Sequence, residues 1–465
     1  MASYLRIALV GLLLSLNVHV LALSTEKKMN PLKLPVFEKT ILENGMSLWL
    51  SEDKEQPVVF FQLMMPIGTL YDPLGKEGML TLISQMLEQG TRSFSGEDIT
   101  RKINQVGGRL TVLPSLYGLE IHCQVLKKDI DLAISLIQEL SQFPTFPAKD
   151  LERKKKQSVF AIKKQKTDPD YLATRYLDEL VFGPKQRSGR EATIQSISKI
   201  NQSNINDFYY NHASPVGTVL VCIGDINSKE LKKKLTKRFS SWAAKTMNKQ
   251  TEQPQSATKQ QLWVVNKEGL SQTTIALSLP GLKQTDPEFV AYRMMNYILG
   301  ASSFSSRLMN EVRVKKGLTY SIYSSMQLEP DYGLFTIKTF TRNEEVAVTI
   351  DAIKQTCDQL INEGMTKEEL DAAKSYYRGN LPIRYETPLQ KASHMLNAWQ
   401  QGLSDQEIRQ ELLNLEKVTL KEVNTFIKRY FKDKEWQIVL VSDYSKIKDQ
   451  LKKSGLSVAK QLEVE

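Results

Sequence analysis

Residues 305–340 read SSRLMNEVRVKKGLTYSIYSSMQLEPDYGLFTIKTF. The apolar spacing predicts a helix from Ser305 to Lys316 that stops at Gly317. Two strands then follow, Leu318 to Met326 and Tyr332 to Phe340, and form a hairpin. This order of helix, glycine and hairpin is the unit from which we infer the fold.

The same unit occurs earlier in the chain. Gly96 to Val106 is predicted to be a helix that ends at two glycines, and Arg109 to Val125 a hairpin that turns at Tyr117-Gly118. Tyr117-Gly118-Leu119 therefore corresponds to Tyr332-Gly333-Leu334. Such internal repetition predicts an α+β protein with two homologous domains, each a mainly antiparallel β-sheet packed under helices.

A polar stretch divides the two repeats. Thr246 to Gln261 is rich in Gln, Lys, Ser and Thr and nearly free of large apolar residues, a composition typical of linkers. We therefore expect an N-terminal domain at 30–245, a linker at 246–261 and a C-terminal domain at 262–465. Further strands and helices are expected at Phe37–Leu50 (a hairpin), Val58–Met65, Gly78–Glu88, Lys128–Gln142, Ala148–Lys166, Val216–Ile223, Thr273–Ser278, Glu288–Leu299, Val346–Glu363, Thr366–Gly379 and Glu435–Val441.

The N-terminus has the pattern of a secretory signal peptide. Arg6 supplies a positive charge, Ile7 to Leu16 is almost wholly apolar, and Ala22 is a small residue suited to cleavage. We predict a signal peptide at residues 1–22 and an exported protein, periplasmic in a bacterium or secreted elsewhere. A retained N-terminal anchor is the alternative. No later segment is long and apolar enough for a stable membrane span.

Net charge and cysteine content limit the classes of partner and the kind of cysteine chemistry that we expect. The net charge is +10, which fits a basic solvated surface or attraction to acidic peptides or anionic membranes. No nucleic-acid-binding motif is present, so we expect no nucleic acid partner. Cys123, Cys222 and Cys357 are few and widely spaced, which favours buried free thiols over a disulfide framework.

Residues 78–91, GMLTLISQMLEQGT, resemble the zinc helix of the M16 (pitrilysin, insulinase and mitochondrial processing peptidase) family. That family places two His four residues apart on one helix face, with a Glu before the second His. Here the three positions hold Thr81, Ser84 and Gln85, and the family's third ligand, a downstream Glu, falls on Ala161. The resemblance therefore implies a degenerate site, with no zinc and no catalytic residue of its own.

Of the four histidines in the sequence, three lie beyond the predicted signal peptide and could in principle supply a metal site. His122 shares a strand face with Glu120 and Gln124, His212 is expected in a loop, and His394 on a helix. A polar strand face is more often plain surface than a metal site, and neither of the other two has a partner at ligand spacing. We expect no replacement metal site.

Ser306 to Ser321 resembles the C-terminal-domain motif of the same family. In that family an Arg, and a Tyr seven residues later, hold substrate backbone and the scissile carbonyl at a facing zinc site. Arg313 and Tyr320 have this spacing, and both side chains are good donors to carbonyl oxygens. The alternative is structural: Arg307 would pair with Glu311 one helical turn away, and Tyr320 would pack within a strand.

The resemblance implies a function that depends on a second chain. One branch of the family builds its peptidase from two half-length chains, one with the zinc and one with the Arg/Tyr pair. We therefore expect a non-catalytic subunit of a heterodimeric zinc-dependent endopeptidase, inactive alone. Its zinc would lie in the homologous partner subunit, and its substrates would be peptides or unfolded proteins. A scaffold or peptide-binding protein without a role in proteolysis is the alternative, and homodimerisation stays open.

Overall fold

The computed structural model describes residues 34–464 except 247, 256–258 and 433. The predicted signal peptide lies outside these residues. We refer to residues 34–246 as the N-terminal half and to residues 259–464 as the C-terminal half. No helix among the described residues has the length and apolar character needed to cross a membrane.

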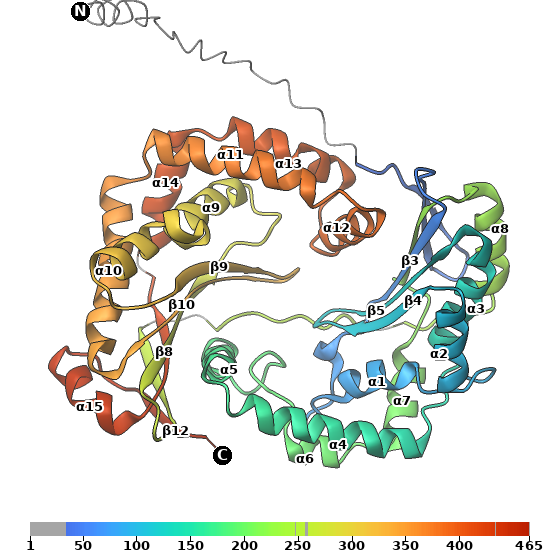
Figure 1. Cartoon of the computed structure of the whole chain (residues 1–465), viewed down its shortest axis with the longest axis horizontal. Helices are drawn as coiled ribbons and strands as arrows, with labels where there is room; N and C mark the ends of the chain where they lie inside the picture. Colours follow the sequence, from blue (N-terminus) through green and yellow to red (C-terminus); the bar gives the residue numbers. More distant parts are fainter. Residues whose placement is uncertain (1–33, 247, 256–258, 433, 465) are drawn as a thin grey trace, which may run out of the picture. The chain divides into compact units, whose positions relative to one another are not determined.

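Each half contains one six-stranded sheet (Figure 1). The N-terminal sheet has the order β1-β2-β6-β3-β5-β4, and the C-terminal sheet has the order β12-β7-β11-β8-β10-β9. The strands are β1 Glu38–Ile41, β2 Ser47–Glu52, β3 Val58–Met65, β4 Arg109–Pro114, β5 Leu119–Leu126, β6 Val219–Gly224, β7 Gln261–Asn266, β8 Gln272–Gly281, β9 Ile322–Leu328, β10 Gly333–Arg342, β11 Gln437–Ser442 and β12 Lys460–Glu463.

The two sheets share one topology over five strands. In each, a hairpin (β5 with β4, or β10 with β9) pairs antiparallel with β3 or β8, and a late strand inserts parallel to β2 or β7. The outer strands differ, because β1 pairs antiparallel with β2 whereas β12 pairs parallel with β7. The predicted α+β class with two repeated sheets is confirmed, and both sheets are mixed with a majority of antiparallel pairs.

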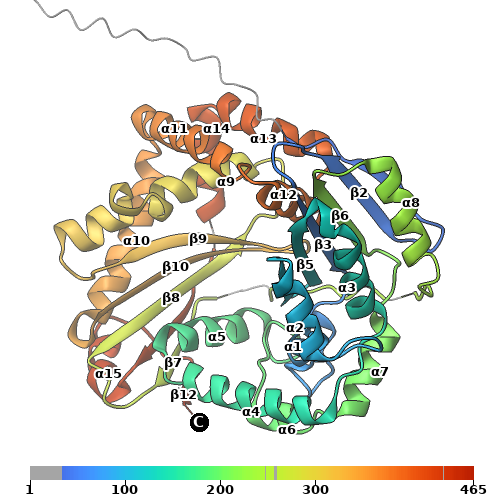
Figure 2. The ribbon, with the colours of Figure 1, turned by 45° about the vertical axis from the view of Figure 1, so that its right-hand side comes forward.

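Helices complete both halves (Figure 2). In the N-terminal half they are α1 Met79–Leu87, α2 Gly96–Gln105, α3 Ile130–Gln142, α4 Ala148–Gln165, α5 Pro169–Phe182, α6 Ile194–Ser198, α7 Gln202–His212 and α8 Ser228–Phe239. In the C-terminal half they are α9 Phe289–Asn296, α10 Val346–Glu363, α11 Lys367–Ile383, α12 Pro388–Gln400, α13 Asp405–Lys417, α14 Leu420–Phe431 and α15 Tyr444–Lys453. Two π-helices, η3 Tyr297–Ala301 and η5 Met309–Lys315, and a 3₁₀ turn, η4 Ser303–Ser305, follow α9.

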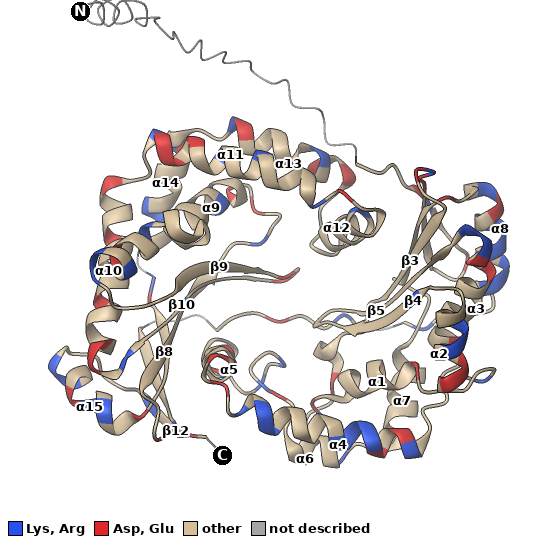
Figure 3. Ribbon diagram, in the orientation of Figure 1, with Lys and Arg blue, Asp and Glu red and all other residues tan. Residues whose placement is uncertain are grey.

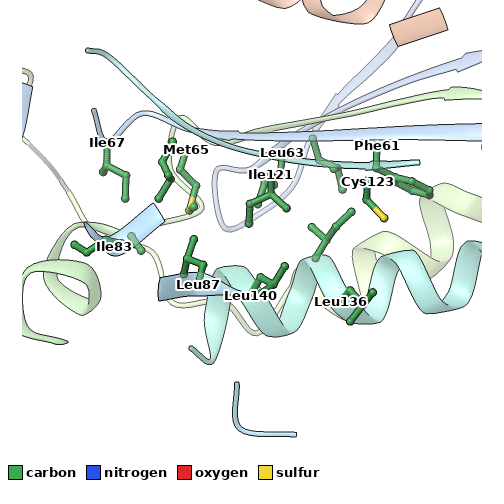
Figure 4. Close-up of a cluster of buried hydrophobic side chains, with 14 of the residues drawn as sticks. Phe61, Leu63, Met65, Ile67, Ile83, Leu87, Ile121, Cys123, Leu136 and Leu140 are labelled. Atoms are coloured by element: carbon green, nitrogen blue, oxygen red, sulfur yellow. The ribbon is translucent and has the colours of Figure 1, made fainter. Parts of the chain in front are cut away.

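The core of the N-terminal half lies between its sheet and helices α1 and α3 (Figure 4). Alternate residues of β3 and β5 point toward these helices, as the two-residue period of a strand requires. Each such large apolar side chain contributes roughly 1.5–3 kcal/mol when fully buried. The contributing residues shown are Phe61, Leu63, Met65, Ile121 and Cys123 from the strands and Ile83, Leu87, Leu136 and Leu140 from the helices.

The opposite face of each sheet is covered by a helix from the other half. Helix α5 packs on β8 and β11 of the C-terminal sheet through an apolar cluster that includes Leu177 and Val181. Helix α12 packs on β3 and β6 of the N-terminal sheet. That second contact is partly polar, since Ser393 Oγ donates to Gln62 Oε1 at 3.1 Å and Lys391 pairs with Asp53. Each half thus supplies a helix to the sheet of the other.

The connection between the halves is anchored. In the predicted linker Glu252 is buried, and its carboxylate accepts hydrogen bonds from the backbone amide and the hydroxyl of Ser188. The backbone amide of Gln253 donates to Gln186 Oε1 at 2.7 Å. The described part of this segment contains no helix or strand before β7 begins at Gln261.

Basic residues are frequent on helices, among them α4, α8 and α15, while the strands carry few charged residues (Figure 3). The runs at 154–156 and 232–234 lie on α4 and α8 and are half-buried or exposed. Both are therefore solvated helix faces. The three cysteines are free and buried, as predicted.

Two elements near the C-terminal motif differ from the sequence prediction. The expected helix from Ser305 to Lys316 is a 3₁₀ turn followed by the π-helix η5. The strand expected from Leu318 begins only at Ile322. Hydroxyl groups hold the residues in between, because Thr341 Oγ1 donates to the carbonyl of Leu318 and Thr339 Oγ1 donates to that of Ser321. Tyr320 is consequently not part of a strand.

Candidate functional site

Helix α1, which carries the degenerate zinc motif, is fixed at its N-terminus by a buried carboxylate. Asp72 accepts hydrogen bonds from the backbone amides of Gly78 at 2.8 Å and Leu80 at 2.9 Å, and it pairs with Arg187. Gly78 has φ +93°, which favours glycine, and an added Cβ would lie 2.8 Å from Ile197 Cδ1. Burial raises the pKa of Asp72, against the effect of Arg187 and the two amides.

The side chains at the zinc-ligand positions do not form a metal site. Ser84 is buried and donates its hydroxyl to the carbonyl of Thr81 at 2.8 Å, within the same helix turn. Thr81 and Gln85 are half-buried, and Ala161 is exposed on α4, which packs against α1. A hydroxyl, an amide and a methyl group do not fit Zn²⁺, which takes imidazole, thiolate or carboxylate ligands. The described residues contain no group of three His, Cys, Asp or Glu side chains placed to hold a metal ion.

One carboxylate follows these positions along α1. Glu88 lies one turn beyond Gln85, and burial raises its pKa against the effect of the Val112 backbone and the charge of Lys154. It therefore faces β4 and α4 near the end of the helix.

His122 belongs to a polar network instead of a metal cluster. Its Nε2 lies 2.6 Å from Glu120 Oε2, and the same oxygen accepts from Gln62 Nε2 at 2.8 Å. Gln62 in turn accepts from Ser393 of α12. The shared strand face of His122 and Glu120 was predicted, and it contributes to the contact between the N-terminal sheet and α12.

The other two histidines are structural. His212 is the last residue of α7 and not part of a loop as expected; its ring stacks on Phe208 at 4.4 Å. His394 Nε2 lies 3.8 Å from Glu411, which also pairs with the buried Arg293. Burial opposes ionisation of Glu411, but the nearby His394 together with the charge and hydrogen bond of Arg293 hold its pKa at about 2.

Arg313 and Tyr320 lie side by side. The guanidinium carbon of Arg313, on η5, is 5.3 Å from the centre of the Tyr320 ring and 4.8 Å from that of Phe304. The Tyr320 ring is 78% exposed. Within the described chain no carboxylate pairs with Arg313. The two predicted donors therefore form one solvent-facing group whose hydrogen-bonding capacity is free.

The chain around Tyr320 is rigidly held although its side chain is exposed. Leu318 and Thr319 are buried. Thr339 Oγ1 donates to the carbonyl of Ser321 at 2.8 Å and lies 2.9 Å from Thr319 Oγ1. The residues on both sides of Tyr320 are thus bonded to β10, and only the tyrosine projects. Preorganised donors of this kind are what carbonyl recognition requires.

Arg307 has a different role from Arg313. Its guanidinium forms two hydrogen bonds with Glu369, at 2.7 and 2.8 Å, and a third with the carbonyl of Gly364 at 2.7 Å. It therefore joins the motif to the start of α11. The pair of Arg307 with Glu311, which belonged to the structural alternative, does not form, because Glu311 pairs with Lys315 instead.

Phe304 was not identified from the sequence. Its ring is 69% exposed and lies against Arg313. An apolar residue just before the motif would be expected to point into the core. The sequence feature that could have indicated a turn here is the position of Phe304 among four serines, which are poor helix formers and favour turns.

Comparison with known proteins identifies the family. The family model described as insulinase (peptidase family M16) matches residues 48–190. The model described as peptidase M16 inactive domain matches residues 199–377. Together the two matches cover more than half of the chain.

Individual relatives are similar over most of their length. The chain is 27% identical to "Non-peptidase homolog YmxG" of Helicobacter pylori over 96% of this chain and 100% of the relative. It is 24% identical to "Uncharacterized zinc protease YmxG" of Bacillus subtilis, over 86% and 97% of the two chains. The crystal structure of a protease from Helicobacter pylori has the same fold, with a TM-score of 0.81 at 16% identity, over 88% of this chain and all of the other. From the two family matches, we conclude that the chain belongs to the M16 peptidase family.

Proposed function

We propose that this chain is the non-catalytic subunit of a two-chain zinc-dependent endopeptidase. In this role Arg313 and Tyr320 would hold the backbone and the scissile carbonyl of a peptide at the zinc site of a homologous partner subunit. The observation that carries the proposal is the pairing of the half-buried Arg313 with the exposed Tyr320, two uncommitted donors on a rigid segment. The zinc would belong to the partner, since the side chains at Thr81, Ser84, Gln85 and Ala161 do not fit it.

The chemistry available in this chain suits carbonyl recognition. The guanidinium carries five N–H donors and the phenol one O–H donor, and both can donate to a carbonyl oxygen as it gains negative charge. Substrates would be short peptides or unfolded proteins. We also propose that residues 30–245 and 262–465 act as the two domains of the subunit.

The test is a mixing experiment. The chain and a zinc-bearing homologous peptidase from the same source are assayed alone and together with a quenched fluorescent peptide, and zinc is measured in each. We expect no zinc and no hydrolysis from this chain alone, and a rate above that of the partner on mixing. Removal of one oxyanion donor costs roughly 10²- to 10³-fold in rate, so Arg313→Ala and Tyr320→Phe should abolish most of the stimulation.

Matched controls are available in the same half. Arg342→Ala removes an exposed arginine that pairs with Glu345, and Tyr376→Phe removes the hydroxyl of a partly exposed tyrosine. Both should stimulate like the wild type. Full stimulation by the Arg313 and Tyr320 variants would show that these two side chains are not needed for the subunit role. A wild-type chain that stimulates no partner would instead favour the alternative, a scaffold or peptide-binding protein without a role in proteolysis.

We further propose that residues 1–22 direct export, with the periplasm of a bacterium as the destination. The motivation is the charged, apolar and small-residue order of this segment. Fractionation of cells that express the full chain, with intact-mass analysis of the product, tests this proposal. A cytoplasmic product that keeps Met1 would contradict it.

A further inference from the structure

The support of Arg313 consists of aromatic rings and not of carboxylates. Phe304 and Tyr320 both lie within the distance at which a cation is attracted to a ring face, at 4.8 and 5.3 Å. Arg307, six residues earlier, donates hydrogen bonds to Glu369 and to the carbonyl of Gly364. A ring attracts the guanidinium without accepting its in-plane N–H groups, so these groups stay free for another acceptor.

The backbone next to the exposed Phe304 has a strained conformation. Ser303 has φ +54°, a conformation that L-residues rarely adopt. Three hydrogen bonds secure it: Ser306 donates to the Ser303 carbonyl from its hydroxyl at 2.9 Å and from its amide at 3.1 Å, and the Ser305 hydroxyl donates to the Ser302 carbonyl. The buried Ser306 thereby anchors a turn whose aromatic ring stays 69% exposed. A strained backbone that is held in place by its surroundings is a reason to propose a functional role for the turn.

We propose that Phe304 is a positioning residue for Arg313. Its ring and that of Tyr320 fix the orientation of the guanidinium while leaving its N–H donors available to a peptide carbonyl or carboxylate. The orientation of Arg313 is a property of this chain alone. Its use on a peptide rests on the proposed function.

The first test needs no partner. The isolated full chain is treated with phenylglyoxal, which modifies accessible arginines, and the rate at Arg313 is followed by peptide mass analysis with Arg342 as the internal reference. Loss of an exposed cation–π contact corresponds to a change of about two- to fivefold, so Phe304→Ala should raise the rate at Arg313 by that factor. Because the ring is exposed, the variant should fold, and its melting temperature checks this.

Conservative variants separate an aromatic effect from simple shielding. Phe304→Trp should react as slowly as the wild type or more slowly, since indole is the strongest ring partner for a cation. Phe304→Leu keeps an apolar side chain of similar size and should react like Phe304→Ala. Equal rates at Arg313 in the wild type and all three variants would overturn the inference, and so would a leucine variant that matches the wild type.

The mixing experiment then separates this inference from the proposed function. In the stimulated reaction Phe304→Ala should raise KM for the peptide more than it lowers kcat, and Phe304→Trp should restore both. A wild-type chain that stimulates nothing, with the labelling pattern as expected, overturns the subunit role and leaves the positioning of Arg313 standing. If the wild type stimulates the partner but the rate of modification at Arg313 is the same in all Phe304 variants, only the positioning role of Phe304 is overturned.

Discussion

Arg307 and Arg313 lie six residues apart in one motif, yet the first is bonded to Glu369 and Gly364 and the second lies against the rings of Phe304 and Tyr320. The first arginine therefore stabilises the fold, while the second keeps its donors free. This division makes the two residues matched controls for each other, because the same substitution should have opposite consequences at the two positions.

Replacement of the two arginines should separate stability from recognition. Arg307→Ala removes three hydrogen bonds from a largely buried side chain and should lower the free energy of unfolding by about 1–3 kcal/mol. Arg313→Ala removes exposed cation–π contacts and should cost under about 1 kcal/mol. Urea unfolding followed by circular dichroism measures both. Equal losses at the two positions would contradict the assigned roles.

Gly78, at the start of the degenerate zinc helix, should be hard to replace. Gly78→Ala combines a left-handed φ with a Cβ placed 2.8 Å from Ile197, so a loss of about 2–3 kcal/mol is expected. Gly75 has φ +76° but open space around it, and Gly75→Ala should cost only about 1 kcal/mol. Thermal melting compares the two. A difference of zero would show that Ile197 moves aside freely.

Glu329 should make stability fall as the pH rises. Burial raises its pKa to about 7, with the charges of Glu252 and Asp331 adding to the effect. Below pH 4 the carboxyl is protonated in both folded and unfolded chains and has no effect; above pH 7 the folded protein must ionise a group that the unfolded chain ionises readily in water.

Glu329→Gln should therefore raise the free energy of unfolding by up to about 3 kcal/mol at pH 8 and leave it nearly unchanged at pH 4. Glu268→Gln, at an exposed position, is the control and should have little effect at either pH. Denaturant titrations at the two pH values provide the measurement. A gain of the same size at pH 4 would exclude ionisation as its cause.

Two histidines placed on α1 should restore metal binding. Thr81 and Gln85 are both half-buried and one turn apart, so Thr81→His with Gln85→His would place two imidazoles on one helix face. Zinc at about 100 times its dissociation constant should then stabilise the double variant by about 2.7 kcal/mol. Thr81→His alone is the control. Thermal melting with and without zinc shows the effect, and an unchanged melting temperature of the double variant would mean that the two side chains diverge.

Local patterns predicted many elements correctly. The strand at Val58–Met65 and the helix at Val346–Glu363 have the predicted ends. In both, the pattern of apolar residues matches the surface that becomes buried. The correspondence between the two hairpins also predicted the repeated sheets, since a repeated order of elements implies a repeated way of burying them.

What could not be predicted depends on contacts distant in sequence. Leu318 to Ser321 has a strand-like composition, but hydroxyls of Thr339 and Thr341 hold it out of the strand. Arg307 pairs with a residue of α11 and not with its helical neighbour. The π-helix η5 spans only seven residues, and so short a segment does not let the apolar pattern distinguish a π-helix from an α-helix. The placement of Phe304 beside Arg313 follows from that geometry.

The reciprocal placement of α5 and α12 determines how the chain can be divided. A cut between residues 246 and 261 would leave a C-terminal fragment whose sheet lacks the apolar cover of α5, and an N-terminal fragment that retains α5 with its Leu177 and Val181 face exposed to water. Neither fragment would be a self-sufficient folding unit. The repeat in the sequence records two copies of one pattern, but each copy covers part of the sheet of the other. We therefore expect separately expressed halves to be stable only after they recombine.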